Sequence, residues 1–316
     1  MKHKYLFGPV ASRRLGISLG VDLVPFKTCS VNCVYCESGV TNNLTLERRE
    51  YIPVDEVIRE LDDLLANSPL IDYLTFSGAG EPTLNSGIGR VISFVKTKYP
   101  QYKICLLTNA TLFSDPGLLE EIADIDLCIP SLDASTDEEF QLINRPSPEL
   151  KFRTYVNALI EYCQNSNAEV WLELFIVPDK NDSDESIDRF ADIIKQAKPD
   201  KVQLNTLDRP GTVDWITPSS GDNTMRFVHA LEPIVPVEAV GPFKYKSPAL
   251  KKHLEPAEID KLVIDLITRR PSTISDMSET FGVSETDIEK RLLFLIKAHI
   301  IKSTTNPRGE FFSLII

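Results

Sequence analysis

The strongest constraint on the fold is an alternation of amphipathic helical stretches with short apolar runs between about residues 55 and 197. Each apolar run favours a strand and is followed by a turn. The predicted strands are residues 16–23, 73–76, 104–107, 127–131, 170–177 and 201–205. The predicted helices are residues 54–66, 89–98, 152–163 and 185–196. This rhythm predicts an α/β fold with a parallel sheet or barrel, and it has fewer strands than a complete eight-stranded barrel needs.

Polar residues, glycine and proline gather directly after several of these strands. The segments are residues 77–82, 108–109 and 178–182. In a βα architecture the carboxyl ends of the parallel strands share one edge, and ligands bind at that edge. The sequence therefore predicts a binding site there.

The chain changes character after the sixth predicted strand. Prolines recur between residues 207 and 256 with little periodicity, which is typical of a covering segment or linker. Beyond it we predict helices at residues 257–269, 273–281 and 284–299, then strands at 300–303 and 311–315 around a turn at 306–309. Three helices and a hairpin resemble a winged helix. We therefore expect three parts, residues 1–207, 208–255 and 256–316.

Three of the six cysteines fall in residues 29–36 with the spacing C-x3-C-x2-C. Cys29, Cys33 and Cys36 can deliver three thiolates to an iron–sulfur cubane that leaves one iron open or takes a distant fourth ligand. A zinc site is the alternative, but it takes four ligands, usually in two pairs, and the sequence has no second pair. The spacing is typical of a metal site and not of a disulfide framework. This favours a cytoplasmic location. The remaining cysteines are expected in the core: Cys105, Cys128 and Cys163.

This loop resembles the cluster loop of the radical S-adenosylmethionine (SAM) enzymes, in which an aromatic residue, here Tyr35, precedes the last cysteine. The resemblance covers most of residues 1–207 and implies a partial (β/α)6 TIM-like barrel. It also implies a [4Fe-4S] cluster on the three cysteines, with SAM bound at its open iron, and an external electron donor of the flavodoxin or ferredoxin type. The implied reaction cleaves SAM reductively to a 5′-deoxyadenosyl radical, which takes a hydrogen atom from the substrate.

The resemblance further implies SAM contacts at the strand ends. Residues 79–82 look like the family's Gly-Gly-Glu-Pro motif, with Ala79 in place of the first glycine. The implied SAM-binding residues are Tyr35, Gly78, Ala79, Gly80, Glu81, Pro82, Thr108, Asn109, Ser131, Asp133 and Asn181. Each short motif has an ordinary alternative as a turn, and residues 181–183 as the N-cap of the next helix. Their order and their positions after strands favour the SAM interpretation.

Residues 7–16, before the first predicted strand, look like a feature of a subgroup near the wyosine-forming tRNA enzymes. Arg13 and Arg14 in this segment are candidates for binding an anionic substrate group or a carboxylate of the barrel, with ordinary surface salt bridges as the alternative. Asn205 and Arg209 follow the last predicted strand, whose end faces the same edge as the cysteine loop. We expect both to contact the substrate.

The net charge of −12 argues against nucleic acid as a partner. Residues 1–254 carry −10 and residues 255–316 carry −2, so neither tight tRNA binding nor DNA binding is expected. A small molecule or a protein side chain is the expected substrate. The alternative function is an iron–sulfur regulator with a DNA-binding winged helix, but the large βα region exceeds what a sensor needs. No apolar run approaches the ~20 residues of a membrane helix, so no membrane contact is expected.

Overall fold

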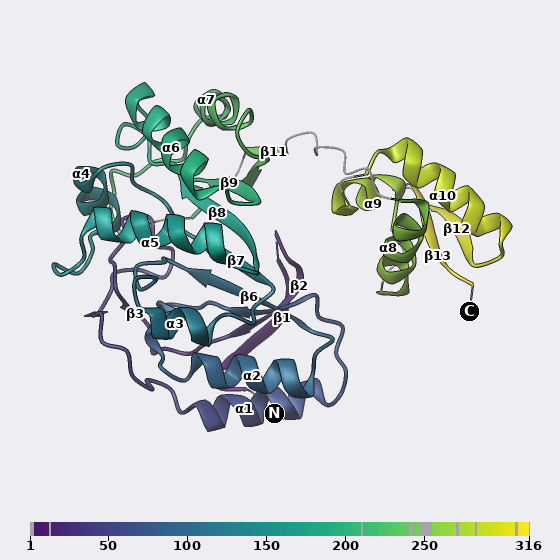
Figure 1. The fold of residues 1–316 in the computed structure, drawn as a ribbon, viewed down its shortest axis with the longest axis horizontal. Coiled ribbons are helices and arrows are strands. Elements are labelled where there is room, and N and C mark those ends of the chain that lie inside the picture. Colours follow the sequence, from purple (N-terminus) through teal and green to yellow (C-terminus); the bar gives the residue numbers. More distant parts are fainter. Residues whose placement is uncertain are drawn as a thin grey trace. The chain divides into compact units, whose positions relative to one another are not determined.

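The computed structural model describes residues 3–12, 14–209, 211–240, 243–246, 255–269, 272–281, 283–306 and 309–315. The chain divides into two compact units, Met1–Tyr245 and Lys246–Ile316 (Figure 1). Arg13 lies outside the described residues, as do the middle of the predicted turn at 306–309 and parts of the predicted segment 208–255.

A nine-stranded sheet organises the first unit. Its strands are β1 Leu6–Ser12, β2 Gly16–Val21, β5 Tyr73–Phe76, β6 Lys103–Thr108, β7 Leu127–Pro130, β8 Glu169–Phe175, β9 Lys201–Asn205, β10 Val237–Val240 and β11 Lys244–Lys246. A separate two-stranded sheet consists of β3 Thr28–Cys29 and β4 Asn43–Leu44. The helices are α1 Val54–Leu65, α2 Ile88–Lys98, α3 Pro116–Glu121, α4 Asp137–Glu139, α5 Phe152–Asn165, α6 Asp184–Ala197 and α7 Gly221–Leu231. The first unit also contains a short 3-10 helix, η1 Pro82–Leu84, and one turn of π-helix, η2 Phe140–Asn144.

The large sheet is mostly parallel. β1 pairs antiparallel with β2, after which β2, β5, β6, β7, β8, β9 and β10 run parallel in that order. The six strands predicted from the sequence are confirmed as β2 and β5 to β9. Helices that follow one another also pack together, α1 on α2, α2 on α3, α5 on α6 and α6 on α7 (Figure 1). The α/β class is therefore confirmed, and the carboxyl ends of the parallel strands share one edge.

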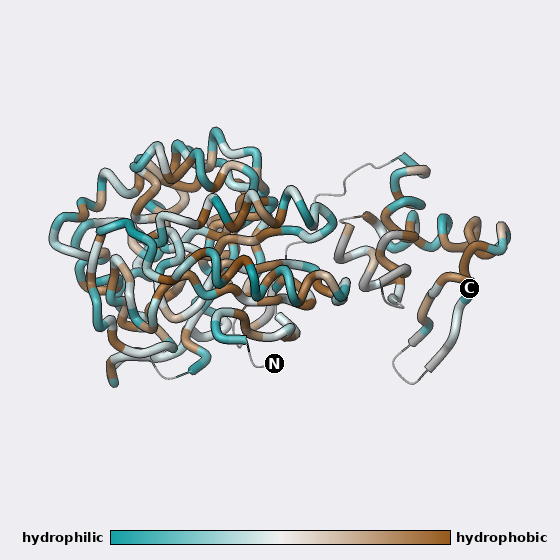
Figure 2. The backbone as a smooth tube through the Cα atoms, turned by 90° about the horizontal axis from the view of Figure 1, so that it is seen from below, coloured by the Kyte–Doolittle hydropathy of each residue, from teal (hydrophilic) through white to brown (hydrophobic). Residues whose placement is uncertain are grey.

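The hydrophobic periodicity explains why these elements pack as they do. Helix α1 buries Val54, Val57, Leu61 and Leu65, which recur at the spacing of one helical face. Strand β7 is instead continuously apolar and wholly buried, because both faces of a parallel sheet are covered there. Figure 2 shows the corresponding change between hydrophobic and hydrophilic residues along the helices. The apolar faces thus fix the orientation of each helix on the sheet.

Several elements were not among those predicted, namely β1, β3, β4, β10, β11, α3, α4 and α7. Strand β1 contains the Gly8-Pro9 pair, which argues against a strand, but β1 lies at the edge of the sheet, where proline is tolerated. Helix α7 and strand β10 lie within the segment expected to be a linker. The Oγ of Ser220 caps α7 by accepting a hydrogen bond from the backbone N–H of Asn223, and β10 extends the sheet by pairing with β9.

The second unit has its own hydrophobic core, in which Val263, Met277, Ile288 and Leu292 are fully buried. Its elements are α8 Pro256–Arg269, α9 Ile274–Phe281, α10 Glu285–Lys297, β12 Ile301–Asn306 and β13 Gly309–Leu314. Strands β12 and β13 form an antiparallel hairpin. The Oγ of Ser284 caps α10 by accepting a hydrogen bond from the backbone N–H of Asp287. None of the helices in the described ranges has the length and hydrophobicity to cross a membrane.

Candidate functional site

Two neighbouring cavities open at the carboxyl ends of the strands. The first, of about 210 Å³, is lined by these predicted site residues: Arg14, Cys29, Cys33, Gly78, Gly80, Glu81, Thr108, Asn109 and Ser131. The second, of about 400 Å³, is lined by Arg14, Asn205 and Arg209 among others. Both cavities share Arg14, Ser77 and Leu107 in their walls. Residues far apart in the sequence therefore meet around two connected spaces.

The cysteine loop is held in place by backbone hydrogen bonds from distant parts of the chain. The N–H of Val34 donates to the carbonyl of Ile143 at 2.9 Å, and the carbonyl of Val34 accepts from the N–H of Thr212 at 2.8 Å. Next to Thr212, a Cβ on Gly211 would lie only 2.6 Å from the same Val34 carbonyl. The segment after β9 therefore covers the loop at very close range, and only glycine fits at position 211.

Each thiol of the loop has a side-chain nitrogen donor next to it. The Nδ2 of Asn109 lies 3.5 Å from the Sγ of Cys29, and the Nδ2 of Asn144 lies 3.5 Å from the Sγ of Cys33. The Nζ of Lys27 lies 3.0 Å from the Sγ of Cys36. All three cysteines are free thiols. Burial raises the pKa of Cys29 to about 12 and also raises that of Cys33.

These thiols suit an iron–sulfur cluster better than a single ion. Among the described residues, no group of three or more His, Cys, Asp or Glu side chains is arranged to hold one metal ion. The thiolates of a cubane bind three different irons and need not converge on one point. Cys29 and Cys33 line the cavity, so a cluster bound there would face it.

The loop after β5 approaches the cysteine loop through its backbone. The N–H of Glu81 donates to the carbonyl of Thr28 at 3.0 Å, and a Cβ on Gly80 would lie 2.2 Å from that carbonyl. Gly78 has a φ of +132°, which side-chain-bearing residues rarely adopt. Glycine is thus required at both positions, whereas Ala79 fits without such a constraint. Pro82 begins the turn η1.

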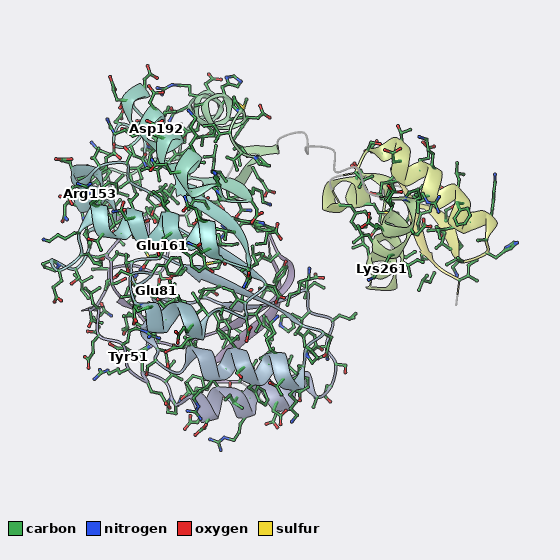
Figure 3. All side chains as sticks on the ribbon, in the orientation of Figure 1. Tyr51, Glu81, Arg153, Glu161, Asp192 and Lys261 are labelled. Carbon is green, nitrogen blue, oxygen red and sulfur yellow. The ribbon has the colours of Figure 1, made fainter. Side chains whose placement is uncertain are left out.

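The carboxylate of Glu81, labelled in Figure 3, is buried, and both of its oxygens accept hydrogen bonds from other residues of the protein. Its Oε1 accepts hydrogen bonds from the hydroxyls of Thr83 and Thr108 at 2.6 and 2.7 Å. Its Oε2 accepts from the backbone N–H of Asn109 at 2.8 Å. Burial raises the pKa of Glu81, and these hydrogen bonds oppose that rise. Glu81 therefore ties the end of β5 to the end of β6.

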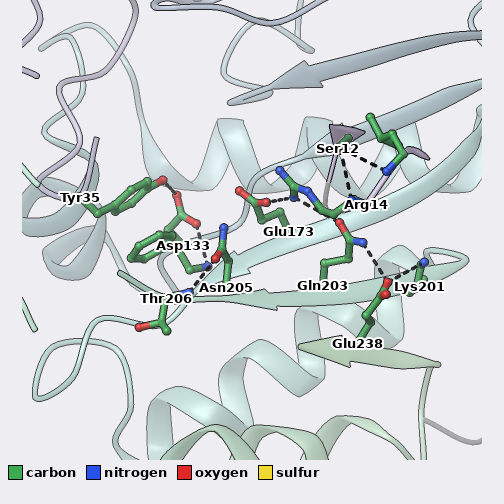
Figure 4. Close-up of polar contacts among 12 residues, drawn as sticks. Ser12, Arg14, Tyr35, Asp133, Glu173, Lys201, Gln203, Asn205, Thr206 and Glu238 are labelled. Atoms are coloured by element: carbon green, nitrogen blue, oxygen red, sulfur yellow. Dashed lines mark hydrogen bonds and ion pairs between the residues drawn. The ribbon is translucent and has the colours of Figure 1, made fainter. Parts of the chain in front are cut away.

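Tyr35, Asp133 and Asn181 form a second polar group, which does not line either cavity in the described part of the chain. The Tyr35 ring stacks on Phe175 with centroids 3.9 Å apart, and its hydroxyl donates to Asp133 (Figure 4). Burial raises the pKa of Asp133 to about 6. Asn181 is completely buried and bonds the backbone of three residues: Asp133, Phe175 and Val177. Their assignment as SAM contacts stays a prediction.

The helix-cap alternative for residues 181–183 is partly confirmed. The Oγ of Ser183 accepts from the backbone N–H of Ser186 and caps α6. Asn181 has a separate role, because its amide joins the ends of β7 and β8.

Arg14 lies at the boundary of the two cavities. It forms an ion pair with Glu173 and donates to the Oε1 of Gln203 at 3.2 Å (Figure 4). Gln203 in turn donates to Glu238, which also binds Lys201 at 2.9 Å. Arg14, whose side chain is 20% exposed, is therefore part of a polar network and not a surface salt bridge.

Of the other predicted substrate residues, Asn205 accepts from the backbone N–H of Thr206 at 2.9 Å. Arg209 pairs with Glu37 at 3.3 Å, and its side chain is 69% exposed. The sequence reasoning missed Lys27, Asn144 and Glu173. The polar residue Glu173 interrupts an otherwise apolar strand, and this was the available signal; nothing in the sequence marked Lys27 or Asn144.

The sequence profile of the Radical SAM superfamily matches residues 23–191, which include the cysteine loop and strands β5 to β8. The chain belongs to the radical SAM superfamily. Enzymes of this superfamily use a [4Fe-4S] cluster and SAM. The superfamily assignment therefore agrees with the cavity lined by the cysteines and the strand ends.

This radical SAM chain is also similar to known proteins along most of its length. It is 35% identical over 299 residues to a protein named GTPase Obg from Brachyspira hyodysenteriae, covering 94% of this chain and 43% of that protein. It is 34% identical over 214 residues to a UPF0026 protein of Methanocaldococcus jannaschii, covering 67% of this chain and 66% of that one. The chain thus spans less than two thirds of each of these relatives. It lacks the G-x-x-x-x-G-K-[ST] pattern of a phosphate-binding loop.

The fold is similar to that of a radical SAM methyltransferase from Sphaerobacter thermophilus. The TM-score is 0.53 at 19% sequence identity, covering 70% of this chain and 65% of that one. At this identity the likeness concerns the fold alone.

Proposed function

We propose that this protein is a radical SAM enzyme that holds a [4Fe-4S] cluster on Cys29, Cys33 and Cys36. The bound cluster and SAM together supply a 5′-deoxyadenosyl radical for hydrogen abstraction from the substrate. In this proposal the part of SAM nearest the cluster lies in the cavity of about 210 Å³, which is too small for the whole molecule, and the substrate lies in the neighbouring cavity of about 400 Å³. The supporting observation is that two of the three cysteines line the same cavity as Gly80, Glu81, Thr108, Asn109 and Ser131.

The protein's own groups would bind and orient SAM mainly through the backbone. Gly78 and Gly80 let the loop after β5 pack closely against Asp22 and the carbonyl of Thr28, which holds the backbone of this loop at the wall of the cavity. Glu81 holds this loop against β6, since its carboxylate is committed to Thr83, Thr108 and Asn109. We assign the direct polar contacts to Thr108, Asn109 and Ser131, whose residues line the cavity.

The second cavity supports a substrate with polar groups. Arg14, Asn205 and Arg209 line it, together with the hydroxyl-bearing Ser18 and Thr75. We propose a small molecule, or a side chain of a peptide or protein, as the substrate. The net charge of −10 over residues 1–254 disfavours a tRNA backbone, in spite of the resemblance of residues 7–16 to proteins near the wyosine-forming enzymes. The electron would come from an external flavodoxin- or ferredoxin-type donor.

We also propose the finer architecture. Residues 1–207 would form a partial (β/α)6 barrel, because their consecutive helices pack side by side along a parallel sheet. Residues 208–255 would cover it, as the contact of Thr212 with Val34 supports. Residues 256–316 would be a winged helix that recruits the substrate, and their three helices and hairpin support this.

The test is anaerobic reconstitution with iron and sulfide, followed by dithionite and SAM, with 5′-deoxyadenosine quantified in the wild type and in Cys36→Ala. We expect formation in the wild type and at least a tenfold loss in the variant, because the variant lacks one of the three ligands. A wild type with an intact cluster that makes no 5′-deoxyadenosine would contradict the proposal and make DNA binding the next assay.

A further inference from the structure

Lys27 places a buried positive charge beside the cysteine loop. The residue is 3% exposed, and its Nζ lies 3.0 Å from the Sγ of Cys36. In the described part of the chain no carboxylate pairs with Lys27. A buried charge is costly unless it is paired, so a lysine at such a site is expected to have a negative partner.

The backbone fixes this arrangement. Lys27 has a φ of +60°, in the left-handed region that a residue with a side chain seldom adopts. Its N–H donates to the carbonyl of Ala79 at 2.6 Å, and its carbonyl accepts from the N–H of Asn42 and of Asn43. Lys27 is therefore held between the loop after β5 and β4. The backbone from which its side chain reaches Cys36 is thus fixed on both sides.

Lys27 differs from the donors at the other two thiols. Asn109 and Asn144 are neutral, and each lies 3.5 Å from its sulfur. Asn109 also donates to Ser30, and Asn144 also donates to Asp133. Lys27 is charged and closer, and in the described residues its ammonium makes no other hydrogen bond. Of the three donors it has the strongest electrostatic effect on its sulfur.

We propose that Lys27 sets the reduction potential of the cluster. This inference rests on the proposed function. A cluster bound through three thiolates carries net negative charge, and reduction adds one more electron. The Lys27 ammonium stabilises that added charge and so raises the potential, since nearby charge and hydrogen bonds to sulfur determine the potentials of such clusters. At a separation of a few ångströms in a buried site, one unit charge changes such an equilibrium by more than tenfold.

The test is a redox titration monitored by electron paramagnetic resonance, on the reconstituted full-length protein without SAM. Lys27→Met removes the charge and the donor, while Lys27→Arg keeps both. Lys98→Met is the matched control, because Lys98 is a half-exposed lysine on α2 that pairs with Asp62. Iron content is measured for every variant.

We expect Lys27→Met to lower the ratio of reduced to oxidised cluster at least tenfold at a given potential. For a one-electron couple this is a midpoint about 59 mV more negative. Lys27→Arg should stay within threefold of the wild type, and Lys98→Met should not change. If Lys27→Met holds full iron and its ratio stays within threefold of the wild type, the proposal is wrong.

Lys27→Gln serves if Lys27→Met loses its iron, since it removes the charge but keeps an N–H donor. The same tenfold criterion then applies, and loss of iron from both neutral variants would also overturn the proposal. A wild type without a reducible cluster would contradict the proposed function itself. An unshifted potential in a Lys27→Met protein that still forms 5′-deoxyadenosine would contradict this inference alone.

Discussion

Asn181 offers a sharp test of how the carboxyl ends of the strands are held. Its side chain is completely buried, and its amide makes three hydrogen bonds to backbone groups at 2.8 to 2.9 Å. In Asn181→Ala the backbone N–H of Val177 loses its side-chain acceptor, and the carbonyls of Asp133 and Phe175 each lose a donor. Leaving a buried polar group unpaired costs about 1–3 kcal/mol. We expect a total loss of about 3–5 kcal/mol in the free energy of unfolding.

Intrinsic tryptophan fluorescence during urea unfolding of the metal-free protein measures this loss. The two tryptophans, Trp171 and Trp215, both lie in the first unit, so the signal follows the unit that contains Asn181. The control is Asn165→Ala on the exposed end of α5, where we expect a change within about 0.5 kcal/mol. If the free energy of unfolding of Asn181→Ala stays within about 1 kcal/mol of the wild type, the hydrogen bonds of Asn181 do not stabilise the strand ends. A direct contact with SAM then becomes the better interpretation.

Two further predictions concern the cluster ligands and the second unit. Alanine at Cys29 or Cys33 should abolish iron binding, whereas alanine at the buried Cys105 or Cys128 should leave the iron content unchanged. A colorimetric iron assay measures both. Iron loss from a folded Cys105 variant would show that a ligand is missing from the proposed set. Removing residues 256–316 should preserve the cluster and SAM cleavage, because the second unit has a separate core, while turnover of the real substrate falls at least tenfold. A shortened protein without a cluster would make that unit part of the core fold.

Six strands of the large sheet could be predicted from the sequence because their buried residues leave short runs rich in apolar side chains. β5 and β9 match their predicted ranges, and β7 is one residue shorter than its own. Strand β1 was missed since Gly8 and Pro9 interrupt its pattern, and only its position at the edge makes them acceptable. Strand β10 was missed because it lies among prolines and depends on β9 for its pairing.

The candidate site was predictable where residue type and spacing carry the chemistry. The cysteine spacing and the Gly-Glu-Pro segment were enough to single out Cys29, Gly80 and Glu81. The folded chain places all three in the wall of one cavity. Long-range contacts leave no such pattern. Lys27 is an ordinary lysine in the sequence, and only the folded chain shows that it is buried against Cys36. Likewise, no sequence pattern near Asn181 indicates that its amide forms hydrogen bonds with three separate backbone positions.

The contact between Thr212 and Val34 also has a consequence for the order of events during protein synthesis. The cysteine loop leaves the ribosome well before Ile143 and Thr212, which are its backbone partners at Val34. Until residue 212 has emerged, Val34 lacks one of these partners, and the three thiols remain on a loop that is not yet fixed. Since domains fold as units, iron and sulfide would be inserted after nearly all of the first unit has been translated. Iron and sulfide would therefore meet an almost complete first unit and not an isolated cysteine loop.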